Sequence, residues 1–272
     1  NSVTELNIPQ TVVYQGTEYT VTSIGDGAFD YYNQSKNNKG LTISSVNLNN
    51  VSLTIGKNAF RGLPNLTEVV GMGNITEISD AAFNSCKVLK KVSDLSALTS
   101  IGDRAFMICP ELAELDGIEW SSLTHIGKQA FQFYSTSDPE LTSSLKLELT
   151  ENTFQSLTSI GEGAFSGCSG VTGKVVFPES ITEIPNSVFS GTGITDVDFS
   201  HITSIGNGAF KDCAGLTELK LSDSVTAIGD KAFSGTGISG KLVLPDSITE
   251  IGSYAFDNVK ITGSLVLPKS LI

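Results

Sequence analysis

The sequence is poor in positive charge, in histidine and in long apolar runs. Its 272 residues contain 17 Lys and Arg against 29 Asp and Glu, which gives a net charge of -12 at pH 7. This balance argues against binding to nucleic acid or to anionic membranes, because both need clustered positive charge. No apolar run reaches the roughly 18 residues that a membrane-spanning helix requires. There are only two His and one Trp.

The composition is nevertheless that of a folded protein. Hydrophobic residues make up 39% of the chain and charged residues 17%, too apolar a mixture for intrinsic disorder. The first residue is Asn1 rather than Met, and no signal peptide is visible. We therefore expect a processed or trimmed piece of a longer protein.

A repeated motif with a basic period of about 23 residues runs through the chain. Ser23–Phe29 (SIGDGAF) and Ser100–Phe106 (SIGDRAF) are two of its ten copies, each of which ends at a Phe. Ile lies five residues before the Phe in every copy, and Gly lies four residues before it in eight. The ten anchor residues are Phe29, Phe60, Phe83, Phe106, Phe131, Phe165, Phe189, Phe210, Phe233 and Phe256.

Each copy predicts one turn of a solenoid. Upstream pairs such as Leu242 and Leu244 alternate with outward residues, the period of a strand with one buried face. We interpret the Gly before the anchor as a residue that allows a tight bend, and the segment around the anchor as one helical turn. A unit of this size cannot close a core alone, whereas stacked units bury their apolar faces against each other. The whole chain, 1–272, is therefore predicted to be a single solenoid.

The segment Leu216–Ile238 (LTELKLSDSVTAIGDKAFSGTGI) resembles the repeat of BspA-type leucine-rich repeat proteins, and Ser180–Phe199 and Ser224–Leu244 carry most of the same motif. The resemblance covers essentially the whole chain. It implies a right-handed leucine-rich repeat solenoid, mainly β with short parallel strands and one short helical turn per repeat. It also implies a bacterial protein that is secreted or displayed on the cell surface and serves adhesion or recognition. No catalytic residue and no cofactor come with the family.

The four cysteines all lie three residues after an anchor Phe, where other copies carry residues such as Thr192 and Thr236. We expect Cys86, Cys109, Cys168 and Cys213 to be free, buried thiols in one column of the core. A bond between Cys86 and Cys109 stays open, because adjacent turns bring them within reach.

Other tempting patterns have plainer explanations. Gly235–Gly240 spells G-x-G-x-x-G but precedes an expected strand instead of a helix, so we interpret it as a turn. His125 and His201 are expected at the surface, with no Ser-His-Asp pattern around them. Asp196 and Asp198 share the outer face of one strand and are expected to be solvated, although they could bind a cation weakly.

Two kinds of surface are candidates for partner binding. Val243 and Val266 adjoin on the outer side of the strands, and exposed aliphatic residues can mark a contact patch, although β-branched residues also simply suit a strand. Two insertions, Asp30–Gly40 and Gln132–Ser144, begin with aromatic residues, namely Tyr31 and Tyr32 in the first and Phe133 and Tyr134 in the second. Loops on a rigid scaffold often carry binding, and the alternative is that these rings fold back over the solenoid flank.

The two ends of the chain differ. Residues 1–22 are expected to form a first strand and a hairpin that caps the solenoid. Residues 265–272 repeat 242–249 and then stop in the middle of a unit, so the C-terminal end is expected to be uncapped and truncated. A following domain, or self-association with another chain, would then cover it.

Taken together, the sequence predicts a non-enzymatic recognition or adhesion module outside the cell that binds a protein or a glycan. The alternative is a structural spacer that presents another domain of a larger surface protein. Neither nucleic-acid binding nor direct membrane insertion is expected, and no cofactor or metal is implied.

Overall fold

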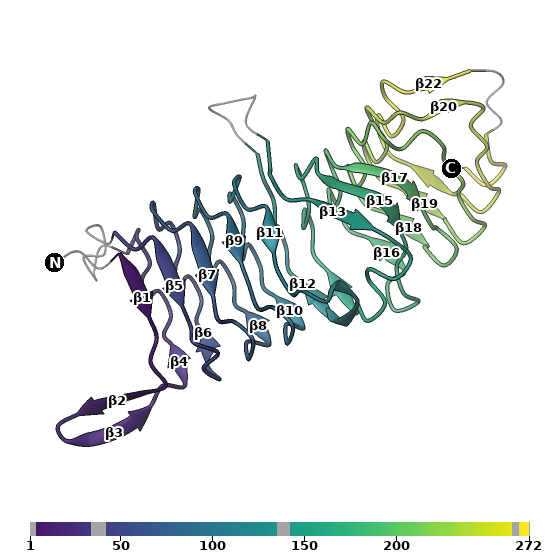
Figure 1. Ribbon diagram of the computed structural model, residues 1–272. Coiled ribbons are helices and arrows are strands. Elements are labelled where there is room, and N and C mark those ends of the chain that lie inside the picture. Colours follow the sequence, from purple (N-terminus) through teal and green to yellow (C-terminus); the bar gives the residue numbers. More distant parts are fainter. Residues whose placement is uncertain (1–3, 34–41, 135–141, 263–266, 272) are drawn as a thin grey trace.

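The computed structural model describes residues 4–33, 42–134, 142–262 and 267–271. The chain winds into an elongated solenoid whose turns stack from one end to the other (Figure 1). We number the ten turns by their anchor Phe, from Phe29 in the first to Phe256 in the tenth. The predicted solenoid of parallel strands is confirmed.

One side of the solenoid carries the first set of parallel strands, which we call the strand face. The Cα register aligns Ser45, Glu68, Lys91 and Glu114 across four adjacent strands. A break separates two groups of strands on this face. The first group is β1 (Glu5–Asn7), β5 (Ser45–Asn47), β7 (Glu68–Val70), β9 (Lys91–Val92) and β11 (Glu114–Leu115), and the second is β13 (Leu147–Leu149), β15 (Val171–Val175) and β17 (Gly193–Val197).

The second set of strands, which we call the isoleucine sheet, holds the Ile that lies five residues before each anchor. These two-residue strands pair Ile with Ile from turn to turn, again in two groups. The first group is β4 (Ser23–Ile24), β6 (Thr54–Ile55), β8 (Glu77–Ile78), β10 (Ser100–Ile101), β12 (His125–Ile126) and β14 (Ser159–Ile160). The second is β16 (Glu183–Ile184), β18 (Ser204–Ile205), β19 (Ala227–Ile228) and β21 (Glu250–Ile251). A short pair, β20 (Ser239–Gly240) and β22 (Lys260–Ile261), lies near the C-terminal end, and a 3-10 turn, η3, spans Trp120–Ser122.

The ten anchor rings form one continuous stack through the core. Neighbouring ring centroids lie 5.3 to 6.0 Å apart, and the ring planes stay within 11° of parallel. The eight inner rings are buried, whereas Phe29 and Phe256 at the two ends are only partly buried. Each turn therefore contributes one ring to a stack that runs along the length of the core.

The expected helical turn at the anchor does not form. The residue two positions before the anchor has a positive φ in all ten turns, from Gly27 to Tyr254. Because a left-handed residue interrupts the helix, successive backbone N–H groups point alternately to a carbonyl of their own turn and to a carbonyl of the next turn. Ala82 N–H donates within its own turn to Ser79, at 3.2 Å, while Phe83 N–H donates to Ala105 of the next turn, at 2.9 Å.

The Gly four residues before the anchor has a different role from the one expected. Its φ is not positive; instead, the backbone of the previous turn passes directly beneath it. A Cβ at Gly102 would lie 2.7 Å from the backbone nitrogen of Asp80, and one at Gly252 would lie 2.3 Å from that of Asp230. Glycine is favoured here because a side chain on the same backbone would collide with the previous turn.

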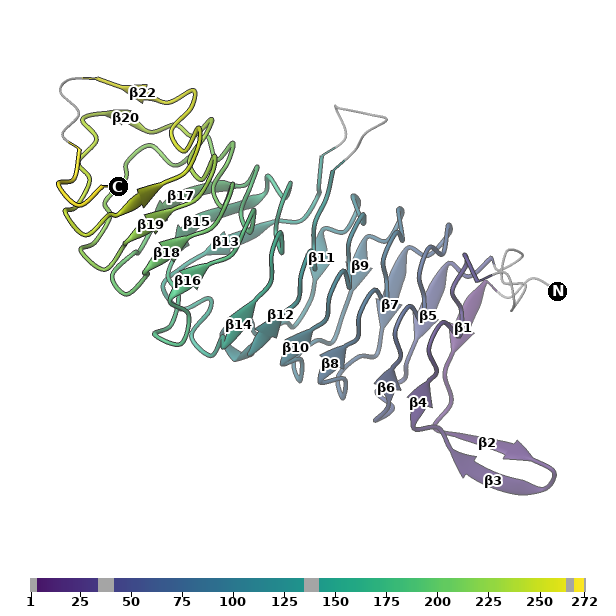
Figure 2. The same ribbon diagram turned by 180° about the vertical axis from the view of Figure 1, so that it is seen from behind.

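Residues 11–20 form a hairpin, but the hairpin does not cap the solenoid. β2 (Thr11–Tyr14) and β3 (Thr17–Thr20) pair antiparallel around a two-residue turn, Gln15-Gly16, and project away from the stack in both views (Figures 1 and 2). All residues of the two strands except Thr11 are exposed. The first turn is instead built on β1, whose Leu6 pairs with Val46.

Candidate functional site

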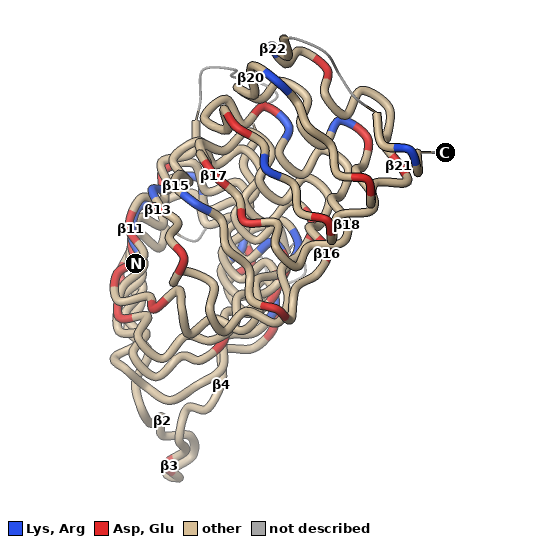
Figure 3. Tube along the Cα trace, turned by 90° about the vertical axis from the view of Figure 1, so that its right-hand side faces the viewer, with Lys and Arg blue, Asp and Glu red and all other residues tan. Residues whose placement is uncertain are grey.

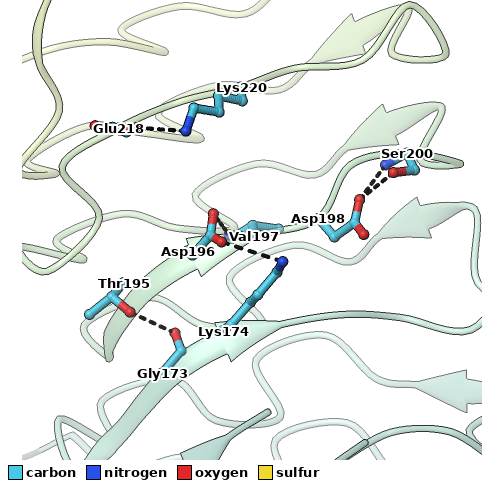
Figure 4. Close-up of polar contacts among 9 residues, drawn as sticks. All are labelled: Gly173, Lys174, Thr195, Asp196, Val197, Asp198, Ser200, Glu218 and Lys220. Carbon is cyan, nitrogen blue, oxygen red and sulfur yellow. Dashed lines mark hydrogen bonds and ion pairs between the residues drawn. The ribbon is translucent and has the colours of Figure 1, made fainter. Parts of the chain in front are cut away.

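The strand face is a surface whose outward side chains are not committed to the core. Its central part carries Lys174 from β15 and Asp196 from β17, whose charged groups lie 3.6 Å apart, and the next turn adds a Lys220–Glu218 pair at 2.8 Å (Figure 4). A shallow hollow of about 400 Å³ lies between Lys174, Asp196 and Lys220. These are exposed ion pairs, which contribute little to stability and are available to a partner.

Asp198 is held by its own turn. Its carboxylate accepts hydrogen bonds from both the backbone N–H and the hydroxyl of Ser200, the former at 2.9 Å. The Ser200 hydroxyl bond lowers the pKa of Asp198, with the Ser200 backbone bond as the next cause. Asp196 and Asp198 therefore have separate neighbours, and across the described parts of the chain no three His, Cys, Asp or Glu side chains gather as a metal site would require.

The earlier half of the strand face has a second mixed-charge cluster. Lys91 Nζ lies 2.5 Å from Asp116 and 3.1 Å from Glu114, and hydrogen bonds to these carboxylates, with Asp116 first, raise the pKa of Lys91. A polar hollow of about 650 Å³ extends from this cluster to Asn50 and Asn74. Acidic and basic residues are interspersed along the molecule (Figure 3). The surface is therefore suited to a partner recognised through many polar contacts.

The aromatic residues of the first insertion fold against the solenoid. Tyr31 is half-buried, and the Tyr32 ring covers Gly62 and lies 5.5 Å from the Arg61 guanidinium, with half of the residue still exposed. Arg61 also binds the buried Asp30 through two hydrogen bonds, at 2.8 and 3.1 Å. This bidentate pair fixes the base of the insertion and was not anticipated from the sequence, because the two residues lie in different repeats.

The second insertion separates its two aromatic residues. Phe133 is only 5% exposed, so it is buried and not available as a contact residue. Tyr134 beside it is 54% exposed. Val243 is exposed on the strand side, between the buried Leu242 and Leu244. Val266, its expected neighbour, lies outside the described residues.

The projecting hairpin is an apolar surface that the sequence interpretation missed. Val12 pairs with Tyr19 across the strands, and Tyr14 shares their side of the hairpin. Val12, Tyr14 and Tyr19 are all largely exposed, and so is Val13 on the opposite side. The signal was present: neither strand contains a Lys or Pro, the residues that commonly protect a free strand edge.

The four cysteines are free and buried, as predicted. Each thiol donates to the carbonyl oxygen of the anchor Phe one turn earlier, as in Cys213 to Phe189 at 3.0 Å and Cys86 to Phe60 at 3.2 Å. Burial raises the pKa of Cys86 and Cys168 to about 12 and that of Cys213 to about 11. These thiols are structural, because a thiol that stays protonated is a poor nucleophile.

One Ser–His contact occurs on the isoleucine sheet. His125 Nδ1 lies 2.6 Å from the Ser159 hydroxyl of the next turn. No carboxylate is hydrogen-bonded to this histidine among the residues that the structure describes, so the pair lacks the orienting group of a catalytic triad. No described helix is long and apolar enough to span a membrane.

The stacked parallel strands and the invariant Ile and Phe positions define a leucine-rich repeat solenoid, a class of repeat protein that serves as an interaction scaffold. The chain belongs to the family described as BspA type leucine rich repeat region, which matches residues 23–157 and 145–262 in six copies. No curated protein matches the chain.

Solved bacterial structures share this architecture. A leucine-rich repeat protein from Bacteroides ovatus is 24% identical with a TM-score of 0.59, and the match covers 98% of this chain and 62% of that one. The chain thus spans less than two thirds of that protein. A leucine rich cell surface protein from Faecalibacterium prausnitzii is 21% identical (TM-score 0.33, 97% and 89% covered), and the pneumococcal vaccine antigen PcpA is 16% identical (TM-score 0.44, 99% and 83% covered). The fold similarity rests on the first of these.

Proposed function

We propose that the chain is a non-catalytic recognition or adhesion module, displayed outside a bacterial cell, that binds a protein or a glycan through its strand face and the adjoining Tyr32 and Tyr134. The observation that carries the proposal is that inward side chains build the core while outward side chains remain exposed. The inward residues are committed to the stack, whereas Lys174 pairs with Asp196 and Lys220 pairs with Glu218 on an open surface. Membership of the BspA-type family supports the location outside the cell.

A binding screen tests the proposal. The purified chain is presented to host matrix proteins, mucins and a glycan array, and at least one of these should bind in a salt-dependent manner, because the candidate contacts are charged. Asp196→Asn and Tyr134→Ala should weaken that binding without changing the melting temperature. Glu77→Gln is the matched control, since it removes one exposed carboxylate from the isoleucine sheet instead.

A silent screen, or equal loss of binding with Asp196→Asn and Glu77→Gln, contradicts recognition through the strand face. The first of these outcomes favours the alternative function, a spacer that holds another domain away from the cell. The continuous stack of ten rings supports that alternative, because it makes a long body with a single core. A spacer predicts that deleting whole turns shortens the reach of the attached domain while its own activity persists.

A further inference from the structure

The two sheets of the solenoid are interrupted at different places. On the strand face no ladder joins β11 to β13, and on the isoleucine sheet none joins β14 to β16. The sixth turn contains β13 and β14. Its β14 pairs with β12 of the fifth turn, and its β13 pairs with β15 of the seventh turn. It is the only turn among the described residues that belongs to both halves of the molecule.

The break in the isoleucine sheet follows from one residue. In seven turns the Gly before the anchor donates its N–H to the Ile carbonyl of the previous turn, as Gly206 does to Ile184 at 2.8 Å. The seventh turn has Pro185 at this position, which has no N–H to donate and carries a ring where the turns pass closest. Ser79 is the other replacement of this Gly. Its turn also lacks the bond within the described residues, but Ser79 keeps its N–H and β6 and β8 remain paired there.

A second bond is lost beside the first. Thr158 N–H donates to Thr124, and Thr203 N–H donates to Thr182, each at 2.8 Å. The equivalent bond from Thr182 to Thr158 is missing from the described chain, although the Ser180 hydroxyl just before it still donates to the Leu157 carbonyl at 2.8 Å. Hollows of about 600 Å³ and 210 Å³ lie along the gap, lined by Ile160, Pro185 and Glu183 among others.

The aromatic core continues across the gap. The Phe165 and Phe189 rings, which face each other across it, lie 5.8 Å apart, within the 5.3 to 6.0 Å range of the whole stack. Three backbone bonds beside the rings still cross it, from Gly163 to Asn186, from Phe165 to Val188 and from Gly167 to Ser190. The gap is thus closed on the anchor side and along β13–β15, and open on the isoleucine sheet.

We propose that the sixth turn is an articulation between two stacks, the first to fifth turns and the seventh to tenth turns. Bending widens the gap between β14 and β16 while the β13–β15 ladder and the aromatic stack hold the halves together. Since each turn contacts only its neighbours, the interrupted ladder between β14 and β16 lowers the cost of opening at that place. The bend changes the curvature of the strand face, and so lets one chain fit partners of different shape.

Hydrogen exchange measures the opening directly. The amides of Gly163 and Phe165 cross the gap, and those of Gly208 and Phe210 occupy the same repeat positions between intact turns, donating to Asp230 and Ala232. We expect the first pair to exchange about tenfold faster, the effect of losing roughly one hydrogen bond's worth of local stability. Equal exchange of the two pairs would overturn the proposal.

Two substitutions test the cause. Pro185→Gly introduces the residue that eight other turns carry, and it should slow exchange of Gly163 and Phe165 to the level of Gly208 and Phe210. Gly206→Pro places the same interruption in an intact turn and should speed exchange of Phe189, whose N–H bonds to Ala209. If Pro185→Gly folds and leaves the exchange unchanged, Pro185 is not the origin of the opening. If Gly206→Pro does not fold, the proposal is still tested by comparing exchange of Gly163 and Phe165 with that of Gly208 and Phe210 in the parent chain.

Paired spin labels distinguish bending from local fraying. Labels on Ser100→Cys and Ser204→Cys span the joint over four turns, and labels on Ser23→Cys and His125→Cys span four turns within one stack. All four sites lie at the same repeat position, and the native thiols are buried. The distance distribution across the joint should be the broader one and should narrow with Pro185→Gly. Equal widths contradict an articulation.

Discussion

Ala81 and Ala82 are adjacent residues of the third turn with opposite backbone and packing environments. Ala81 has a φ of +53° and is half-buried, whereas Ala82 is fully buried with an ordinary φ. The same pair of positions recurs in every turn, because the left-handed residue is what directs alternate N–H groups to the next turn.

Glycine substitution should therefore have opposite effects at these two sites. Ala81→Gly removes about 1–2 kcal/mol of left-handed strain and adds about 0.5–1 kcal/mol of chain entropy cost, so the free energy of unfolding should rise by about 0.5 kcal/mol. Ala82→Gly adds that entropy cost and loses a buried methyl group, so it should fall by about 1–2 kcal/mol. Urea denaturation of both variants measures the difference, and effects of the same sign contradict this account.

The aromatic stack should weaken according to position. Phe106→Ala removes a buried ring from between two others and should cost about 3–5 kcal/mol. Phe256→Ala removes a partly buried ring with a single stacked neighbour and should cost clearly less. Calorimetric melting of the two variants tests this, and a Phe106→Ala protein that melts like the parent would show that the ring is not in the core.

The buried thiols should make the fold sensitive to alkali. In the unfolded chain a thiol ionises near pH 8.5, well below the pKa of about 12 that burial gives Cys86 and Cys168. Between these values the unfolded state has lost protons that the folded state retains. The contribution of the buried thiols to the free energy of unfolding is therefore intact below about pH 8.5. Above that pH it declines, by at most about 1.4 kcal/mol per pH unit for each thiol.

The chain itself supplies the control for this pH dependence. Thr192 and Thr236 occupy the cysteine position in other turns and donate to a Phe carbonyl there. Between about pH 9 and pH 11 the free energy of unfolding should fall less steeply with pH in Cys86→Thr than in the parent, because one of the buried thiols no longer contributes to the slope. A thiol reagent should label none of the four cysteines in the folded protein and all four in urea. Rapid labelling of the folded chain would contradict the burial.

The hairpin should be dispensable for folding. Val13 is 70% exposed, so Val13→Lys should change the free energy of unfolding by less than about 0.5 kcal/mol. A hairpin that sealed the end of the solenoid would instead bury this residue, and a buried lysine would cost several times more. Denaturation of Val13→Lys beside a Val46→Lys control, which places the charge in the core, separates these two cases.

Much of the architecture could be predicted because the repeat leaves one consistent way to bury its apolar residues. An Ile and a Phe at fixed positions in ten copies must face the same interior, and the stacked rings follow from that requirement. The cysteine column follows for the same reason. The helical turn was wrong because spacing of three residues places Phe83 and Cys86 together in either conformation, and only the φ of Ala81 distinguishes them.

The candidate site was harder to predict because it depends on contacts between turns. Tyr32 lies on Gly62, and Phe133 is buried while Tyr134 is not; neither arrangement has a periodic signal. The hairpin has the same sequence pattern whether it packs or projects. Pro185 was visible as an exception to the repeat, but its effect on the sheet requires knowing that its neighbours donate to the turn below.

The close approach at the glycines allows neighbouring turns to stack tightly in most of the molecule. Because Gly102 and its equivalents lack a Cβ, the outward side chains of consecutive turns can lie this close together. A ligand with its own regular spacing, such as a polymer of identical sugars or an extended repetitive peptide, would meet side chains that recur at a constant distance. Adding whole repeats to the solenoid keeps that distance unchanged, whereas replacing a single glycine would change it locally.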